Sequence, residues 1–375
     1  MKIVIIGGVA GGASAAARLR RLDEQAEIVV FERTGYMSYA NCGLPYYIGG
    51  VIRDEADLSL QTPESFYARF RIDVRVRQEV TSIDRAAKTV SVRPLDGGSP
   101  YTEHYDKLIL SPGARPVKPP LPGVDSARVF TLRTVEDTLR LRAQAMSAGS
   151  GSAVIVGGGF IGVELAENFR ELGLWVTIVE KQPQLLGQFD ADMVSFLHAH
   201  LREKGVGLLL GRSVERFAET ADGIIVHTDG GALPQADMAV LAIGVTPENT
   251  LSEAAGLELG ARGAIAVDAH MRTSDPDIYA VGDAVEVIAR TTGRRTTVAL
   301  AGPANRQGRV AADNICSLPS VYRGAAGSSV LKVFDRTAAS TGISERTARG
   351  LGIDCAAVIL SPLSHASYYP GAQVM

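Results

Sequence analysis

Cys42 is the side chain of this sequence best suited to nucleophilic chemistry. It lies in the segment SYANCGLPY (38–46), between Asn41, a residue typical of a helix N-cap, and a short apolar stretch. A thiol at a helix N-terminus is shifted toward thiolate from an ordinary pKa of about 8.5. Because thiolate is the reactive nucleophile, we expect Cys42 to be redox-active. We expect Cys316 and Cys355 to be buried and inert.

A glycine motif in the middle of the chain predicts a dinucleotide site. The run GGGFIG (157–162) follows an apolar strand and opens an amphipathic helix, and Glu180 ends the next strand. The glycines permit a tight turn and a close backbone approach to a pyrophosphate, and the acid can accept hydrogen bonds from a ribose. A carboxylate there repels a 2′-phosphate and favours NADH, although Lys181 beside it weakens that preference.

A second motif of this kind stands at the N-terminus. The turn GGVAGG (7–12) follows the strand KIVII and keeps the outer glycines, but its middle position is Val9. Gly8 and Gly11 leave the backbone open, and Glu32 ends the next strand, as Glu180 does in the second unit. We therefore expect a dinucleotide here as well.

Two βαβ units would position these glycine turns and their acids. Residues 2–32 and 153–180 each contain a strand, a glycine turn, a helix and a second strand, and their continuous apolar runs are typical of parallel strands buried on both faces. A further strand ends in Gly282 and Asp283. Two dinucleotide sites in one chain indicate an electron path from a nicotinamide to a flavin.

Composition narrows the remaining possibilities. The 375 residues contain 38 lysines and arginines, 41 aspartates and glutamates and only three cysteines, with a net charge of −3. We expect no nucleic-acid binding, no disulfide framework and a reducing, cytoplasmic location. Apolar runs are too short for a membrane span. His198 and His200 lie on different faces of one helix, so we expect no metal site.

The two glycine turns, the segment LILSPGARP and the segment IYAVGD occur in the order found in two-dinucleotide-fold flavoprotein disulfide reductases, which the whole chain resembles. The resemblance implies an α/β fold with two Rossmann-like domains, one for FAD and one for NAD(P)H, followed by an incomplete C-terminal α+β dimerisation domain. The implied ranges are 1–112 with 246–318 for FAD, 113–245 for NAD(P)H and 319–375 for the last domain. We expect a homodimer if that shortened domain suffices.

The resemblance also implies cofactor contacts. For FAD they fall on Gly7, Gly8, Val9, Ala10, Gly11, Gly12, Glu32, Arg33, Asn41, Gly113, Asp283 and Ala304. For NAD(P)H they fall on Gly157, Gly159, Phe160, Ile161, Gly162, Glu180, Lys181 and Gly244. Phe160 resembles an aromatic residue that covers the flavin until nicotinamide displaces it.

The cysteine segment resembles the single-cysteine branch of this family. That branch contains coenzyme A (CoA) disulfide reductases, NADH oxidases and peroxidases, and persulfide reductases. Its oxidases and peroxidases usually carry a histidine where this chain has Ala10, so the resemblance favours CoA disulfide or CoA persulfide as the substrate. The implied CoA contacts are Ser14, Arg18, Arg21, Ser38, Asn41 and Asn305. Phe70 stands where some members have a CoA-binding lysine, and Arg69 or Arg71 could replace it.

The expected activity is therefore FAD-dependent reduction of a CoA-type disulfide by NAD(P)H, through a mixed disulfide with Cys42. A tyrosine of the C-terminal domain, Tyr368 or Tyr369, is implied as a proton donor across the dimer. Two alternatives stay open at this point. One is an NADH oxidase that reduces oxygen through a Cys42 sulfenic acid, and the other is a redox-sensing flavoprotein.

Overall fold

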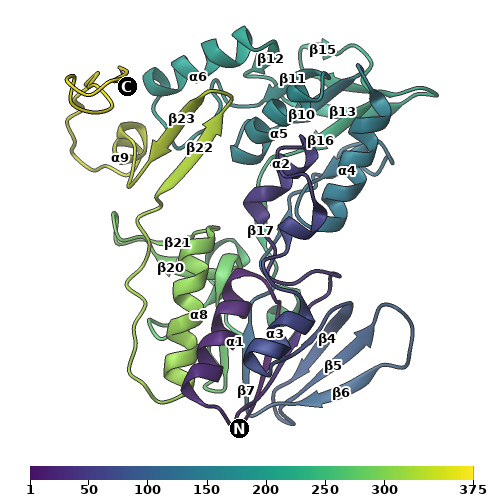
Figure 1. Ribbon diagram of the computed structural model, residues 1–375, viewed down its shortest axis with the longest axis vertical. Coiled ribbons are helices and arrows are strands. Elements are labelled where there is room, and N and C mark those ends of the chain that lie inside the picture. The colour runs from purple at the N-terminus through teal and green to yellow at the C-terminus, as the bar shows by residue number, and fades with distance from the viewer. Residues whose placement is uncertain (375) are drawn as a thin grey trace.

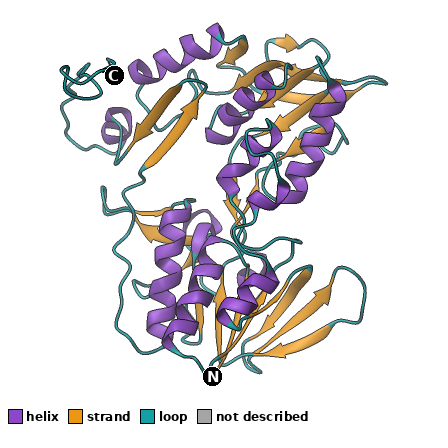
Figure 2. Ribbon diagram, in the orientation of Figure 1, coloured by secondary structure: helices purple, strands orange, loops and turns teal. Residues whose placement is uncertain are grey.

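Apolar runs form the central strands of two parallel sheets, one in each of two lobes. The computed structural model describes residues 1–374. Figure 1 shows the lobes one above the other, with the N-terminus at the foot of the lower lobe and the C-terminal end beside the upper lobe. Figure 2 shows helices packed beside the strands in both lobes. The expected α/β fold is confirmed.

The lower lobe is built on a five-stranded parallel sheet. Its strand order is β19-β7-β1-β2-β3, with β1 (Lys2–Ile6), β2 (Glu27–Phe31), β3 (Asp73–Arg75), β7 (Lys107–Leu110) and β19 (Ile278–Ala280). The helices α1 (Ala10–Leu22) and α8 (Ala301–Ile315) lie side by side next to it (Figure 1). The antiparallel strands β4 (Gln78–Asp84), β5 (Thr89–Pro94) and β6 (Tyr101–His104) contribute valines to the core on its other face. Helix α3 (Pro63–Phe70) completes this lobe on the side of β3.

The upper lobe repeats this plan. Its parallel sheet has the order β12-β11-β10-β16-β9, with β9 (Val129–Thr131), β10 (Ser152–Val156), β11 (Trp175–Glu180), β12 (Val206–Leu210) and β16 (Met238–Leu241). Its helices are α4 (Val135–Ala148), α5 (Phe160–Glu171) and α6 (Ala191–Glu203). The antiparallel strands β13 (Val214–Glu219), β14 (Ile224–Thr228) and β15 (Gly231–Ala232) lie beside this sheet.

Two crossings of the chain between the lobes pair with each other. Strand β8 (Ala114–Pro116) runs antiparallel to β17 (Val245–Pro247). The short elements that follow β17 are α7 (Thr250–Ala254) and a sheet of β18 (Ile265–Ala266), β20 (Val285–Ile288) and β21 (Arg295–Thr297). The division at residues 112/113 and 245/246 stays a proposal, and this pairing of the two crossings supports it.

A segment of the lower lobe's chain reaches the upper lobe. After β2 the chain forms a 3₁₀ turn at Asn41–Gly43 and the short helix α2 (Leu44–Ile48), which packs against α4 and α5 (Figure 1). Leu44, Tyr47 and Ile48 share one buried apolar cluster with residues of both helices. This packing brings Cys42 to the junction of the lobes.

The C-terminal part begins with a hairpin of β22 (Ser329–Val333) and β23 (Arg336–Ser340), followed by α9 (Glu345–Gly350). Apart from an isolated bridge between Leu363 and Val374, residues 351–374 form no further helix or strand. The hairpin packs on α5, so this part of the chain also contacts the upper lobe. Among the helices of residues 1–374, none is both long and apolar enough to cross a membrane.

Candidate active site

In the first glycine turn, a backbone N–H is hydrogen-bonded by Glu32, the acid that follows the next strand. Gly7 has φ +99°, and a Cβ on Gly12 would overlap the carbonyl oxygen of Gly7, so both positions need glycine. Glu32 is buried at the end of β2, where it accepts the Gly8 N–H at 2.9 Å and both the N–H and the hydroxyl of Thr34 at 2.9 Å. Burial raises the pKa of Glu32, and the hydrogen bonds from Gly8 and Thr34 oppose that shift.

The second turn has the same construction. Gly157 has φ +109°, and Glu180 accepts the N–H groups of Gly158 and Gln182, each at 2.7 Å. Gly159 faces open space, as an approaching pyrophosphate requires, and Phe160 begins α5. Ile161 is half-buried, Lys181 is exposed, and Gly244, with φ +109°, lies beyond the end of β16.

The local structure at Cys42 differs from the expected helix N-terminus. Asn41 caps no helix, and Pro45 fits only in the first turn of a helix, so α2 begins after Cys42. Cys42 is exposed, yet partial burial of its sulfur raises the pKa of the thiol, and the carboxylates of Glu164 and Asp283 add to this shift. The expectation that a helix N-terminus lowers the pKa of the Cys42 thiol is therefore wrong for the protein without bound cofactors. The buried Oδ1 of Asn41 has no hydrogen-bond partner among residues 1–374 and is free to meet a ligand.

Asp283 is held by an arginine that the sequence did not indicate. It lies in the 3₁₀ turn Gly282–Ala284 after β19, where its Oδ2 is 2.8 Å from Nη2 of Arg133, which precedes α4. Gly113 adjoins the same guanidinium, since a Cβ there would lie 3.1 Å from Nη2. The two residues are 150 positions apart, so no local pattern could have linked them.

The start of α8 lies beside the first turn. Asn305 accepts the Ser14 hydroxyl at 2.9 Å, and Gly308 packs against the carbonyl oxygen of Gly11. Ala304 is buried in the same helix. Ser38, in left-handed conformation with φ 47°, donates its N–H to the carbonyl of Gly8 at 2.8 Å. These expected FAD and CoA positions are therefore neighbours.

The arginines expected to meet CoA differ in their contacts. Arg18 is 2.7 Å from Asp313 of α8, a structural ion pair that the sequence did not reveal. The guanidinium of Arg21 lies 5.4 Å from the ring centroid of Phe70, and that of Arg69 lies 5.1 Å from it. Arg33, which is an expected FAD contact and not a CoA contact, lies 4.0 Å from Glu79.

Glu164 is a further candidate that sequence reasoning missed. It lies one turn into α5, where burial and the charge of Glu167 raise its pKa to about 7. Its charge in turn raises the pKa values of Cys42 and Tyr46. The short i, i+3 spacing of Glu164 and Glu167 was the available signal.

The structure does not bring the C-terminal tyrosines or the other two cysteines into contact with Cys42. Tyr368 and Tyr369 are 80% and 60% exposed, and their rings contact each other at 4.8 Å. Neither forms a hydrogen bond or ring contact with Cys42 within the described chain. The expectation of buried cysteines is wrong for Cys355, which is exposed, and Cys316 is only half-buried.

The two neighbouring histidines have separate structural partners. His198 accepts the N–H of Leu185 at 3.1 Å, and His200 pairs with Asp335 of the hairpin at 2.5 Å. Burial lowers the pKa of His198. Residues 1–374 contain no group of three or more histidine, cysteine, aspartate or glutamate side chains that could hold a metal ion.

Comparison with known proteins assigns the family. The model of the pyridine nucleotide-disulphide oxidoreductase family matches residues 1–308. The chain belongs to this family. The expected resemblance and the expected oxidoreductase class are thereby confirmed.

Two curated relatives of this oxidoreductase carry different names. An NADH oxidase of Methanocaldococcus jannaschii is 34% identical over 375 residues, which is all of this chain and 83% of the relative. A coenzyme A disulfide reductase of Staphylococcus aureus strain JH9 is 33% identical over 371 residues, covering 99% of this chain and 83% of the relative. Both names are among those that the resemblance of the cysteine segment implies.

Solved structures of the family agree with the fold of this oxidoreductase. Reduced CoADR-RHD of Bacillus anthracis has a TM-score of 0.96 at 47% identity, over 100% of this chain and 67% of its own. A NAD-dependent persulfide reductase from A. fulgidus has a TM-score of 0.96 at 38% identity, over 100% of this chain and 70% of its own.

Proposed function

We propose that this oxidoreductase uses FAD to carry electrons from NADH or NADPH to a CoA-type disulfide or persulfide, through Cys42. One observation carries the proposal. The segment with Cys42 belongs to the chain of the first dinucleotide lobe but packs against α5, the helix that begins at the second glycine turn. The thiol thus lies where groups bound at both turns can meet.

The residues of the lower lobe fit FAD. Its pyrophosphate would be held at Gly7–Gly12 and its adenosine ribose at Glu32, whose oxygens are already oriented by Gly8 and Thr34. Asp283 and the unpartnered Oδ1 of Asn41 would meet its more distant polar groups. When bound, FAD supplies a two-electron carrier between nicotinamide and sulfur.

Cys42 would perform the sulfur chemistry. Its thiolate attacks one sulfur of the substrate RS–SR, forms the Cys42–S–SR bond and breaks the substrate S–S bond, releasing RS⁻. Two electrons from NAD(P)H then cleave the mixed disulfide and release the second thiol. Overall, NAD(P)H, one proton and RS–SR give NAD(P)⁺ and two RSH. Tyr368 or Tyr369 of a second copy would donate a proton to the departing sulfur.

Features of the lower lobe support CoA as the R group. Ser14, Asn305 and Ser38 surround the first turn and offer polar contacts. Arg21 and Arg69 flank Phe70 and form no ion pair within residues 1–374. We propose that they meet CoA phosphates in place of the family's lysine, because guanidinium groups pair well with phosphate.

The variant Cys42→Ser tests the function. We expect the purified protein to keep its flavin absorbance but to lose NADH-dependent reduction of CoA disulfide by at least about a hundredfold, because a hydroxyl cannot form the mixed disulfide. The assay is anaerobic NADH loss. Cys316→Ser is the matched control and should keep its rate. Undiminished turnover by Cys42→Ser would exclude the proposed cycle.

Reduction of oxygen is a second candidate function. The relative from M. jannaschii named NADH oxidase supports it, as it is similar along the whole chain. NADH consumption with oxygen alone, compared with consumption under anaerobic CoA disulfide, measures which acceptor is used. A faster rate with oxygen would favour a Cys42 sulfenic acid over the mixed disulfide.

We further propose a homodimer in the cytoplasm. Exposed apolar side chains of the C-terminal part support pairing, with Val358 at 80%, Ile359 at 68% and Leu360 at 75% exposure. The three free cysteines support a reducing compartment. Light scattering on the FAD-loaded protein measures the assembly mass, and a monomer at all concentrations would contradict the pairing. Detection of the protein in a cell fraction tests its location.

A further inference from the structure

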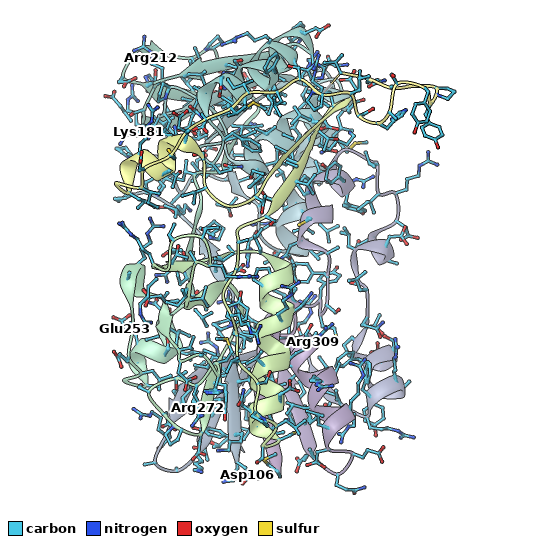
Figure 3. The ribbon with its side chains drawn as sticks, turned by 90° about the vertical axis from the view of Figure 1, so that its left-hand side faces the viewer. Asp106, Lys181, Arg212, Glu253, Arg272 and Arg309 are labelled. Carbon is cyan, nitrogen blue, oxygen red and sulfur yellow. The ribbon has the colours of Figure 1, made fainter. Side chains whose placement is uncertain are left out.

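The loop of residues 181–190 connects β11 to α6 and lies against the second glycine turn. Leu186 donates its backbone N–H to the carbonyl of Gly158 at 2.8 Å. The side chain of Leu185 packs on Gly158, since a Cβ there would lie 2.2 Å from Cδ2 of Leu185, and both leucines are buried. Figure 3 shows Lys181, the first residue of this loop, at the edge of the upper lobe. The glycine turn therefore depends on how loop 181–190 is held.

The ring of His198 holds this loop from α6. His198 is half-buried, and its Nε2 accepts the backbone N–H of Leu185 at 3.1 Å. Only the neutral imidazole can accept this hydrogen bond, because the protonated ring carries an N–H on both nitrogens. The next residue, Leu186, has φ 49°, a left-handed conformation that a leucine keeps only where its surroundings hold it. Protonation of His198 therefore removes a support beside a strained residue that contacts Gly158.

The charges around His198 do not compensate a proton on its ring. Burial lowers the pKa of His198, and Arg202, one turn further along α6, lowers it again. Within the loop, Lys181 is exposed, and the carboxylate of Asp190 accepts two N–H groups of α9. Strand β12, which packs on α6, contains no charged residue. His198 forms no ion pair with an acid of residues 1–374, so its surroundings favour the neutral ring.

The far end of loop 181–190 has supports of its own. Gln184 donates its side-chain amide to the carbonyl of Phe189 at 3.0 Å, and the guanidinium of Arg346 from α9 donates to the carbonyl of Gly187. Neither contact involves His198. Loss of the His198 hydrogen bond should therefore act at the glycine turn and leave the lobe folded.

We propose that His198 is a positioning residue for the nucleotide at the second glycine turn: its neutral ring holds loop 181–190 in place, and its protonation weakens the binding of NADH or NADPH. The inference rests on the proposed function, which places the nucleotide at this turn. When the loop is released, His198 has the ordinary histidine pKa of about 6.5, and when the loop is held its pKa is lower. Binding should therefore be strongest above about pH 6.5 and weaken as the pH falls below it.

ADP-ribose is the probe for the test, because it has the pyrophosphate and adenosine of the nucleotide but no nicotinamide to respond to the titration of Cys42 or Glu164. Titration calorimetry on the FAD-loaded protein measures its Kd from about pH 7.5 to about pH 5.5. We expect the Kd of the natural chain to rise by about three- to tenfold over this range, because about nine-tenths of a released histidine is protonated at the lower pH.

Two variants of His198 separate the hydrogen bond from the charge. His198→Gln keeps an acceptor and does not titrate, so its Kd should stay within about twofold of the natural value at about pH 7.5 and should not change with pH. His198→Ala removes the acceptor, so its Kd should be about threefold or more higher at the same pH. His227→Gln is the matched control, because His227 contacts Arg216 on the antiparallel sheet of this lobe, and it should keep the natural pH dependence.

Two results would overturn the inference and leave the proposed function intact. One is ADP-ribose binding that does not change over this pH range, and the other is a His198→Gln variant with the natural pH dependence. If ADP-ribose binds at no pH and NADH does not bleach the flavin absorbance, the proposed function fails as well.

Discussion

At the scale of single residues, the electrostatics of Cys42 depend on its neighbours across the lobe junction. Burial makes the largest contribution to the raised pKa of its thiol, and the charges of Glu164 and Asp283 raise this pKa further. Asp283 is neutralised in part by Arg133 at 2.8 Å, whereas Glu164 has the acidic Glu167 beside it. Glu164 is therefore the acid whose removal should matter more for the thiol.

We expect Glu164→Gln to move the pH midpoint of Cys42 alkylation to lower pH. Burial and the charge of Glu167 raise the pKa of Glu164 to about 7, so Glu164 is charged and opposes the thiolate over the alkaline range where the thiol ionises. Removing that charge favours the thiolate. The measurement is the rate of iodoacetamide labelling of Cys42 against pH. The variant Glu171→Gln, at the exposed end of α5, is the control, and an equal midpoint in both variants would contradict the assignment.

At the scale of elements, the hairpin β22–β23 is fastened to α5 by a buried acid. Glu167 is 3% exposed and accepts the backbone N–H of Phe334 at 2.7 Å, while Lys332 forms an ion pair with it. Helix α9 is attached in a similar way, since Asp190 accepts the N–H groups of Glu345 and Arg346 at 2.8 and 2.9 Å. These contacts connect the C-terminal part to α5, which begins at the second glycine turn, and to the start of α6.

We expect Lys332→Met to lower the free energy of unfolding by about 1–3 kcal/mol, because it leaves the buried charge of Glu167 with only one hydrogen-bond donor. Lys204→Met removes an exposed pairing with Asp335 at 3.5 Å and should cost about 0–1 kcal/mol. Urea denaturation of the FAD-loaded proteins measures both changes. Equal losses would show that burial of Glu167 adds nothing.

At the scale of the whole molecule, the sequence predicts the two βαβ units, because each is a short segment whose pattern occurs twice. Each βαβ unit carries its strand, turn, helix and acid within about thirty residues, so Glu32 and Glu180 were found from pattern alone. Arg133 with Asp283, and Arg18 with Asp313, join residues far apart in the chain and need the folded structure. The prediction that Asn41 caps a helix was wrong because Pro45 must lie in the first turn, so α2 begins two residues after Cys42.

The packing of segments from outside the upper lobe into its apolar cluster has a thermodynamic consequence. Leu44, Tyr47 and Ile48 come from the lower lobe's chain, and Leu331 and Val333 follow its last helix, yet all five complete the apolar cluster of the upper lobe. Melting the lower lobe therefore removes part of the upper lobe's apolar interior. Calorimetry of the FAD-loaded protein should show one heat-absorption peak, with equal calorimetric and van't Hoff enthalpies. Two separate peaks would mean that each lobe unfolds independently, and that the upper lobe does not need these five side chains to stay folded.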